Sequence, residues 1–218
     1  MTDSEPSGPR EPRSNERATA GEQRESRKHK GSAKRERLVA SAAELLHRNG
    51  VGATSLAGIA QLADVPLGNV YYYYRTKDDL VRAVLAAQSE QVAAMVEGFA
   101  GLPGPAERLK ALASRWDLMR DVVARYGCPF GSLTTELNRR DDGLDRDAAI
   151  PMRSILDWAA SQFQDLGCAE PRELAVALLS AIQGSALLAA TLRDPELLSA
   201  QVHRLHDWID TLVPPATA

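Results

Sequence analysis

The chain has 218 residues, of which 44% are hydrophobic and 25% charged, and its formal net charge is −3. This composition is ordinary for a soluble globular protein and predicts one domain or two small ones. The polar N-terminus lacks an apolar signal core and no apolar run approaches the ~20 residues that span a bilayer, which argues against secretion and against a membrane span.

Charge is distributed unevenly along the chain. Residues 27–82 carry ten Lys and Arg against five Asp and Glu, a balance of +5, whereas residues 98–218 carry twelve against sixteen, a balance of −4. A basic N-terminal part on an acidic remainder is typical of a DNA-binding head on a body with another task. Cys128 and Cys168 are the only cysteines. Two cysteines are too few for a disulfide framework, so we expect a reduced, cytoplasmic setting.

Residues 1–31 form a polar segment that contains Pro6, Pro9 and Pro12 and no large apolar residue after Met1. Such a segment cannot bury a core, and we predict that it is disordered. Its basic end, residues 27–30, continues towards Lys34. This end is either part of a solubilising tail or a basic arm that adds phosphate contacts or enters a minor groove.

Residues 32–80 predict a small helical head. A first helix is expected to begin near Ser32, a suitable N-cap, and to end at Asn49 and Gly50, a suitable C-cap pair. Thr54 or Ser55 then caps the next helix.

The segment from residue 56 to 77 predicts two short helices joined by a tight turn. Ile59 and Ala60 lie at helical spacing, and Pro66 fits the first turn of the second helix, where a backbone donor would be unpaired anyway. That helix, from Leu67 to about Tyr73, is too short to be stable alone and must be held by its neighbours. Its outward amide and hydroxyl groups, with cations beside them, suit the major groove of DNA.

The run from Lys34 to about Val84 resembles the DNA-binding domain of TetR-family transcriptional regulators. The positions that match the family's pattern are Thr54-Ser55, Ile59-Ala60, Ala63, Val65-Pro66, Gly68, Val70-Tyr71, Tyr73-Tyr74, Lys77 and Leu80. The resemblance implies an all-α fold. An N-terminal three-helix helix-turn-helix domain would be followed, over residues 81–218, by a helical ligand-binding and dimerisation domain.

By this resemblance the second short helix is the recognition helix. The residues then expected at the DNA are Lys34, Ser55, Leu67, Gly68, Asn69, Tyr71, Tyr72, Tyr73 and Lys77. Asn69 can pair with adenine, Ser55 caps a helix where a phosphate can bind, and Lys77 would contact phosphate as a point charge. Successive helical residues point about 100° apart, so the four tyrosines cannot all face DNA. Tyr74 and Val70 are expected in the core.

After a linker at residues 101–105, the body is expected to be helical throughout, with helices over residues 106–126, 147–167, 171–191 and 195–213. The third of these is apolar almost all round and must be covered on both sides, by its own domain and by a partner chain. With the last helix it matches the family's dimerisation pair, which forms a four-helix bundle about a twofold axis. The expected interface residues are Leu179, Gln183, Ala186, Leu198, Val202, Leu205 and Ile209.

The run GCPFGSL at residues 127–133, followed by Glu136-Leu137, resembles a TetR-family subgroup that includes drug-, flavonoid- and electrophile-responsive repressors. The resemblance implies a small apolar or aromatic inducer, in a cavity between the helices at 106–126, 147–167 and 171–191. Candidate lining residues are Trp116, Met119, Cys128, Phe130, Trp158, Phe163, Gln183 and Leu187. The alternative for each is ordinary core packing. Gln183 is a polar group in an apolar helix and needs a hydrogen-bond partner.

Together these features predict a homodimeric repressor that a ligand releases from a palindromic operator. One alternative is a repressor that responds to electrophiles or oxidants through Cys128. Another is a helical ligand-binding protein that does not bind DNA. An enzyme is disfavoured, because the chain has no G-x-S-x-G elbow, HExxH motif or Gly-rich phosphate loop. The histidines, His29, His47, His203 and His206, form no recognised metal-ligand cluster, so neither a metal nor a cofactor is expected.

Overall fold

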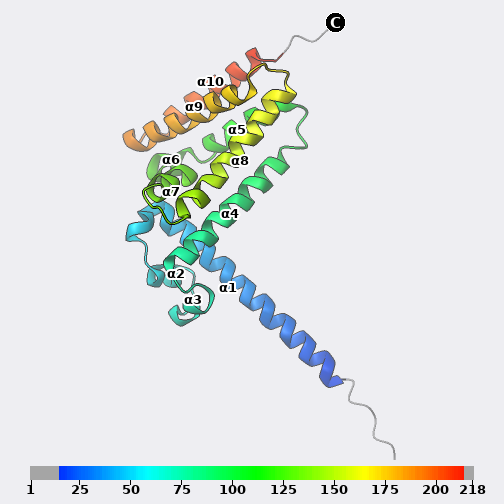
Figure 1. Cartoon of the computed structure of the whole chain (residues 1–218), viewed down its shortest axis with the longest axis vertical. Coiled ribbons are helices and arrows are strands. Elements are labelled where there is room, and N and C mark those ends of the chain that lie inside the picture. Colours follow the sequence, from blue (N-terminus) through cyan, green and yellow to red (C-terminus); the bar gives the residue numbers. More distant parts are fainter. Residues whose placement is uncertain (1–14, 214–218) are drawn as a thin grey trace, which may run out of the picture.

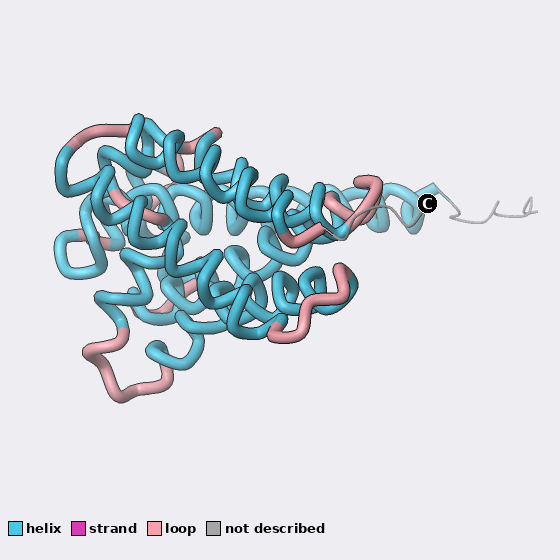
Figure 2. Tube along the Cα trace, turned by 90° about the horizontal axis from the view of Figure 1, so that it is seen from above, coloured by secondary structure: helices cyan, strands magenta, loops and turns pink. Residues whose placement is uncertain are grey.

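The computed structural model describes the backbone of residues 15–213 and the side chains of His29 and residues 31–213. Within that range every regular element is a helix, which confirms the all-α prediction. The helices are α1 (Asn15–Ala53), α2 (Leu56–Leu62), α3 (Leu67–Tyr73), α4 (Lys77–Gly98), α5 (Pro105–Asp117), α6 (Arg120–Tyr126), α7 (Pro129–Leu137), α8 (Leu144–Asp165), α9 (Pro171–Leu192) and α10 (Glu196–Thr211). Figure 2 shows the short loops that join them.

The segments predicted to bind DNA and to form the dimer lie at opposite ends of the molecule. Helices α2 and α3 lie at one end beside α1 and the start of α4, and α9 and α10 lie side by side at the other (Figure 1). The long helices α4 and α8 pack on each other and connect the ends. Movement of one end relative to the other therefore has to involve these helices or the contacts beside them.

Helix α1 is longer than predicted. It begins at Asn15 and not near Ser32, whose hydroxyl donates to Glu36 Oε1 (2.7 Å) inside the helix. Residues 15–31 contain no proline and are mostly strong helix formers, and extending an existing helix adds one hydrogen bond for each residue fixed. The backbone of residues 15–31, part of the segment predicted to be disordered, is helical here, while residues 1–14 lie outside the described residues. The predicted end at Gly50 is confirmed as a break (φ 78°, ψ 170°).

The body departs from the prediction at residues 106–126, where one expected helix is two. Helix α5 ends at Asp117 and α6 begins at Arg120, with Met119 between them at φ −108° and ψ 9°. No Gly or Pro marks this break. Helix α6, which buries Val123 and Ala124, packs against α9. We therefore attribute the break to this tertiary contact and not to the local sequence.

Helix α9 also needs a correction. By length and composition alone α9 could cross a membrane, since an 18-residue window of it has a mean hydropathy of 1.8. We expected no apolar run of this length. The core helix of a soluble protein passes the same test, and in this fold α9 packs against α6, α8 and α10.

The buried apolar residues among those described form two cores. The body core includes Trp116, Phe163, Ile182 and Ile209. The head core is built from α1 to α4 but also takes in residues of α7 and α8; it comprises Leu38, Ala42, Leu46, Val51, Ile59, Ala60, Ala63, Val65, Val70, Tyr74, Leu80, Val81, Val84, Leu85, Leu133, Leu137, Leu144 and Ala148. The predicted burial of Val70 and Tyr74 is confirmed.

Candidate nucleic-acid interface and pockets

The turn between α2 and α3 places the short helix α3 on a buried support. Asp64 adopts φ 51°, a left-handed conformation that Asp tolerates better than most residues. Its carbonyl accepts a hydrogen bond from Arg37 of α1 (3.2 Å), and Val65 N–H donates back to Ala60 O (3.0 Å). Val70 on the inner side of α3 is fully buried. These contacts hold a helix of two turns that could not persist alone.

The outer side of α3 is open to solvent. Tyr72 is 83% exposed and Tyr71 53%, and Leu67 is also exposed. A Cβ added at Gly68 would have no atom within 4 Å, so a partner can approach the backbone there. Asn69 is half-buried beside them. The outer side of α3 thus presents an amide, two phenols and accessible backbone.

Tyr73 lies differently from the prediction. It is half-buried and packs against the head core, and its hydroxyl lies 3.6 Å from the point where a Cβ of Gly31 in α1 would be. Its ring makes an edge contact with Tyr72 (centroids 5.1 Å apart). Tyr73 therefore supports α3 against α1 and orients Tyr72.

The loop between α1 and α2 explains the positions of Ser55 and Lys77. Ser55 Oγ accepts from Gly58 N–H (3.1 Å) and so caps α2, as predicted. Lys77 Nζ donates to the carbonyls of Val51 (2.7 Å) and Thr54 (3.2 Å). The ammonium is directed at the protein's own loop, so the structure does not support the predicted phosphate contact. Lys34 is half-buried on α1.

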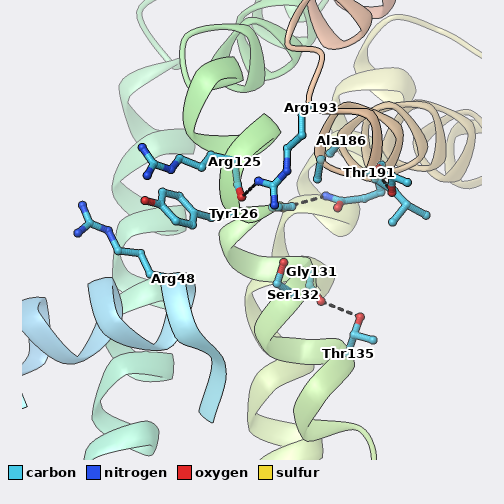
Figure 3. A pocket seen from close by; sticks show the side chains of 14 residues that line it. Arg48, Arg125, Tyr126, Gly131, Ser132, Thr135, Ala186, Thr191 and Arg193 are labelled. Carbon is cyan, nitrogen blue, oxygen red and sulfur yellow. Dashed lines mark hydrogen bonds between the residues drawn. The ribbon is translucent and has the colours of Figure 1, made fainter. Parts of the chain in front are cut away.

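One pocket lies where α1, α6, α7 and α9 meet, and we call it the α6–α9 pocket (Figure 3). It has a volume of about 650 Å³ and is lined by Arg48, Arg125, Tyr126, Gly127, Cys128, Gly131, Ser132, Thr135, Gln183, Ala186, Leu187, Ala190, Thr191 and Arg193. Three of the predicted ligand residues, Cys128, Gln183 and Leu187, belong to it.

The polar groups of the α6–α9 pocket contact one another. Gln183 Nε2 donates to Cys128 Sγ (3.5 Å), so the glutamine has found a protein partner. Figure 3 shows Arg48 of α1 and Arg125 of α6 on the two sides of Tyr126, and their guanidinium carbons lie 5.6 and 5.2 Å from its ring centre. Sequence reasoning missed this cluster, since Arg48 is distant in sequence from the adjacent Arg125 and Tyr126 and none of the three belongs to a recognised motif.

A second pocket, which we call the α4–α5 pocket, has a volume of about 700 Å³ and a more apolar wall. It is lined by Gln88, Gln91, Val92, Ala94, Met95, Gly98, Phe99, Arg115, Trp116, Met119, Pro129 and Phe130. Trp116, Met119 and Phe130 were predicted to line a cavity. The cavity was predicted between α5–α6, α8 and α9, and neither of these two pockets is lined by a residue of α8.

Two predicted lining residues belong to neither pocket. Trp158 packs on Phe99 (ring centroids 5.6 Å apart), and Phe163 is fully buried against Trp208 (5.8 Å). These two aromatic residues therefore pack in the core and do not line either pocket. A helical stripe cannot by itself distinguish a core side chain from one that lines a pocket.

Comparisons with known proteins agree with this geometry. Residues 38–84 match the family described as bacterial regulatory proteins, tetR family, and residues 105–203 match the LmrA/YxaF-like transcriptional regulator C-terminal domain. A protein of Mycobacterium tuberculosis described as an uncharacterised HTH-type transcriptional regulator is 32% identical over 181 residues, which cover 78% of this chain and 90% of that protein. The chain belongs to the TetR family. It is a DNA-binding transcriptional regulator and not an enzyme.

Solved TetR-family structures share the fold. A regulator from Agrobacterium tumefaciens has a TM-score of 0.73 at 18% identity, covering 81% of this chain and 97% of that one. The reduced form of E. coli NemR has a TM-score of 0.69 at 20% identity, covering 84% and 100%. At these identities the likeness shows the fold alone.

TetR-family regulators usually form dimers, and the residues predicted for that contact lie largely inside this chain. Leu179, Ala186, Leu198, Val202, Leu205 and Ile209 are buried in the chain's own body core, and Gln183 is turned towards Cys128. The apolar residues that α9 leaves exposed are Val176, Leu187, Leu188 and Leu192. The more apolar stripe of a helix packs on its own core first, which leaves this other face of α9 open to solvent.

Proposed function

We propose that this TetR-family protein is a homodimeric repressor that reads a palindromic operator with α3 and is released from it by a small ligand bound in the body. The observation that carries the proposal is the exposed outer side of α3, where Tyr71 and Tyr72 stand on a buried support. Large aromatic residues exposed next to one another on a short helix are typical of a binding surface.

In this proposal the start of α3 enters the major groove. Asn69 reads base edges, Leu67 and Gly68 allow close approach of the backbone, and Tyr71 and Tyr72 contact sugar and phosphate. Ser55 and the free amides at the start of α2 receive a phosphate. Lys34 and the basic segment at residues 27–30 add phosphate contacts, which would make binding salt-dependent.

The exposed apolar face of α9 supports a dimer. Val176, Leu187, Leu188 and Leu192 would pack against the same residues of a second copy, with α10 beside them. Two recognition helices would then lie ~34–36 Å apart, one turn of DNA. One α3 reads only a few base pairs, so the dimer supplies both affinity and the palindromic preference.

The α4–α5 pocket is our choice for an apolar or aromatic inducer. Phe99, Trp116 and Phe130 offer aromatic walls, and Gln88 and Gln91 offer amides that can orient a polar group. The pocket lies along α4, which joins the head to the body, so a ligand that fits best at another tilt of α4 would lower operator affinity by linkage. We expect this regulator to act in the cytoplasm.

A response through Cys128 is the second candidate, since its thiol lines the α6–α9 pocket. Cys128 is only 5% exposed and accepts a hydrogen bond from Gln183, which disfavours rapid reaction. We therefore rank release by a reversibly bound ligand above covalent release.

The test is operator binding measured by fluorescence anisotropy at two salt concentrations, with DNA selected by the wild-type protein. Asn69→Ala should weaken binding about tenfold or more, in line with the ~1–3 kcal/mol of a good base contact. Tyr71→Ala should weaken it through the lost contacts to sugar and phosphate. Asn138→Ala, at the exposed end of α7, is the matched control and should bind like wild type. Absence of wild-type binding at low salt would contradict the proposal.

A further inference from the structure

Helix α7 belongs to both cores of the molecule. Cys128, directly before it, lies in the body core, and Phe130 in its first turn packs against the same core. Leu133 and Leu137, further along, are buried in the head core together with residues of α1 to α4. Helix α7 packs on α1 and α8. A helix of nine residues, about 13 Å long at 1.5 Å per residue, thus spans from one core to the other.

The last turn of α7 carries a carboxylate that contacts the head. Glu136 Oε2 accepts from Val51 N–H (2.8 Å), and its Oε1 accepts from Gly52 N–H (3.0 Å). Both donors follow Gly50, where a positive φ interrupts α1. A Cβ on Gly50 would lie 2.9 Å from Glu136 Oε2, so glycine is what lets the carboxylate come this close.

The same loop is held from its other side by Lys77. Glu136 binds the N–H groups of Val51 and Gly52, and Lys77 Nζ binds the carbonyls of Val51 and Thr54. The loop leads directly into Ser55, the N-cap of α2. The start of α2, and through the α2–α3 turn the direction of α3, are therefore fixed by one charge from the body and one from α4.

We propose that Glu136 is a positioning residue for the DNA-reading head, and that α7 transmits the state of the body to it. This inference rests on the proposed reading of DNA by α3. Both pockets touch α7: Pro129 and Phe130 line the α4–α5 pocket, and Ser132 and Thr135 line the α6–α9 pocket. A ligand that shifts α7 moves the Glu136 carboxylate relative to the loop that it holds.

Glu136 suits this task because its role is separable from stability. A carboxylate accepts at both oxygens, whereas the amide of a glutamine would set an N–H₂ group against one of the two backbone donors. An aspartate is one methylene shorter and would not reach both. Glu136 and Gly52 are exposed to solvent, so water can replace the carboxylate at the Gly52 amide.

The experiment compares the variants Glu136→Gln and Glu136→Asp with the control Glu97→Gln. Glu97 is an exposed glutamate of α4, and its substitution removes the same charge as Glu136→Gln. Removing a negative charge by itself favours binding to DNA. We expect Glu136→Gln and Glu136→Asp to weaken binding to the wild-type operator about three- to tenfold. Glu97→Gln should bind as well as wild type or slightly better.

Amide hydrogen exchange supplies a readout that does not depend on DNA. In both Glu136 variants the amides of Val51 and Gly52 should exchange several-fold faster, while those of α9 keep wild-type rates. Unchanged exchange at Val51 and Gly52 would overturn the inference, and so would faster exchange with operator affinity within twofold of wild type. If wild-type protein selects no operator, the proposed function fails, and the exchange data still decide whether Glu136 holds the loop.

Discussion

The side-chain amide of Gln183, in the middle of α9, donates a hydrogen bond to the thiol of Cys128 at the start of α7 (3.5 Å). Gln183 is the polar side chain that stands out in an apolar helix, and Cys128 is the cysteine of the GCPFGSL run. The amino group of the Gln183 amide, which looked available for a ligand, therefore already has a partner within the protein.

We predict from this contact that Cys128 reacts slowly with thiol reagents. Cys128 is buried and Cys168 half-buried, so a maleimide should modify Cys168 first in the native protein, and Cys168 serves as the internal control. Gln183→Ala should raise the rate at Cys128 several-fold by opening the pocket wall. Mass spectrometry of a labelling time course measures both rates. Faster labelling of Cys128 than of Cys168 in the wild-type protein would instead favour a sensor cysteine.

Lys77→Met should destabilise the head. The substitution leaves the carbonyls of Val51 and Thr54 without their charged donor, a loss of roughly 1–3 kcal/mol in the free energy of unfolding. Urea unfolding measures it. Lys34→Met removes the same charge from α1 and should keep the stability while it lowers the salt dependence of operator binding. Equal stability of the two variants would show that Lys77 does not hold the loop.

The ion pair between Arg140 and Asp78 predicts a pH dependence. Arg140 donates to both oxygens of Asp78 (3.0 and 2.6 Å), and this lowers the pKa of Asp78 below its ordinary value of 3.8. A depressed carboxyl pKa stabilises the fold above the unfolded-state pKa, about 3.9, and the stabilisation is lost as the pH falls through the lower folded-state pKa. Because both side chains are about a third exposed, the effect is expected to be small.

Thermal unfolding of the Arg140→Gln variant between pH 3 and pH 6 checks this prediction. Arg139→Gln, a substitution of the neighbouring exposed arginine, is the control. The wild-type protein should unfold at a higher temperature than Arg140→Gln near pH 6, and the difference should shrink towards pH 3. A difference that stays constant over this range would assign the effect to something other than Asp78.

The exposed face of α9 predicts where the dimer can be broken. Leu188→Glu places a charge in the centre of the proposed interface, where it would be buried without a partner, and should convert the dimer into a monomer. Leu118→Glu is the control, because Leu118 is 74% exposed between α5 and α6. Sedimentation velocity distinguishes the two states. A dimer that survives Leu188→Glu would exclude this face as the interface.

Local patterns made the head predictable. The spacing of Ile59, Ala60 and Val70 and the position of Pro66 are sufficient to define α2, the turn and α3, and the observed bounds Leu67–Tyr73 agree with the expectation. The N-cap at Ser55 and the break at Gly50 follow from the same short-range chemistry, because capping and positive φ depend on a few neighbouring residues.

The features that sequence reasoning missed all depend on contacts between distant segments. Nothing near Lys77 indicates that its ammonium binds a loop more than twenty residues earlier, and nothing near Glu136 indicates a contact with Val51, 85 residues away. The break at Met119 likewise carries no local signal, since it serves the packing of α6 on α9. The burial of the predicted interface residues in the chain's own core has the same origin, because helical periodicity identifies an apolar face without identifying what covers it.

Selection from a random DNA pool tests the central claim most directly, since it asks whether α3 reads sequence. With wild-type protein we predict enrichment of one inverted repeat whose half-sites are centred about one helical turn apart. With Asn69→Ala we predict the same repeat with the preference lost at one symmetry-related pair of positions. Enrichment of no sequence, or of a site that Asn69→Ala reads in the same way, would contradict the account.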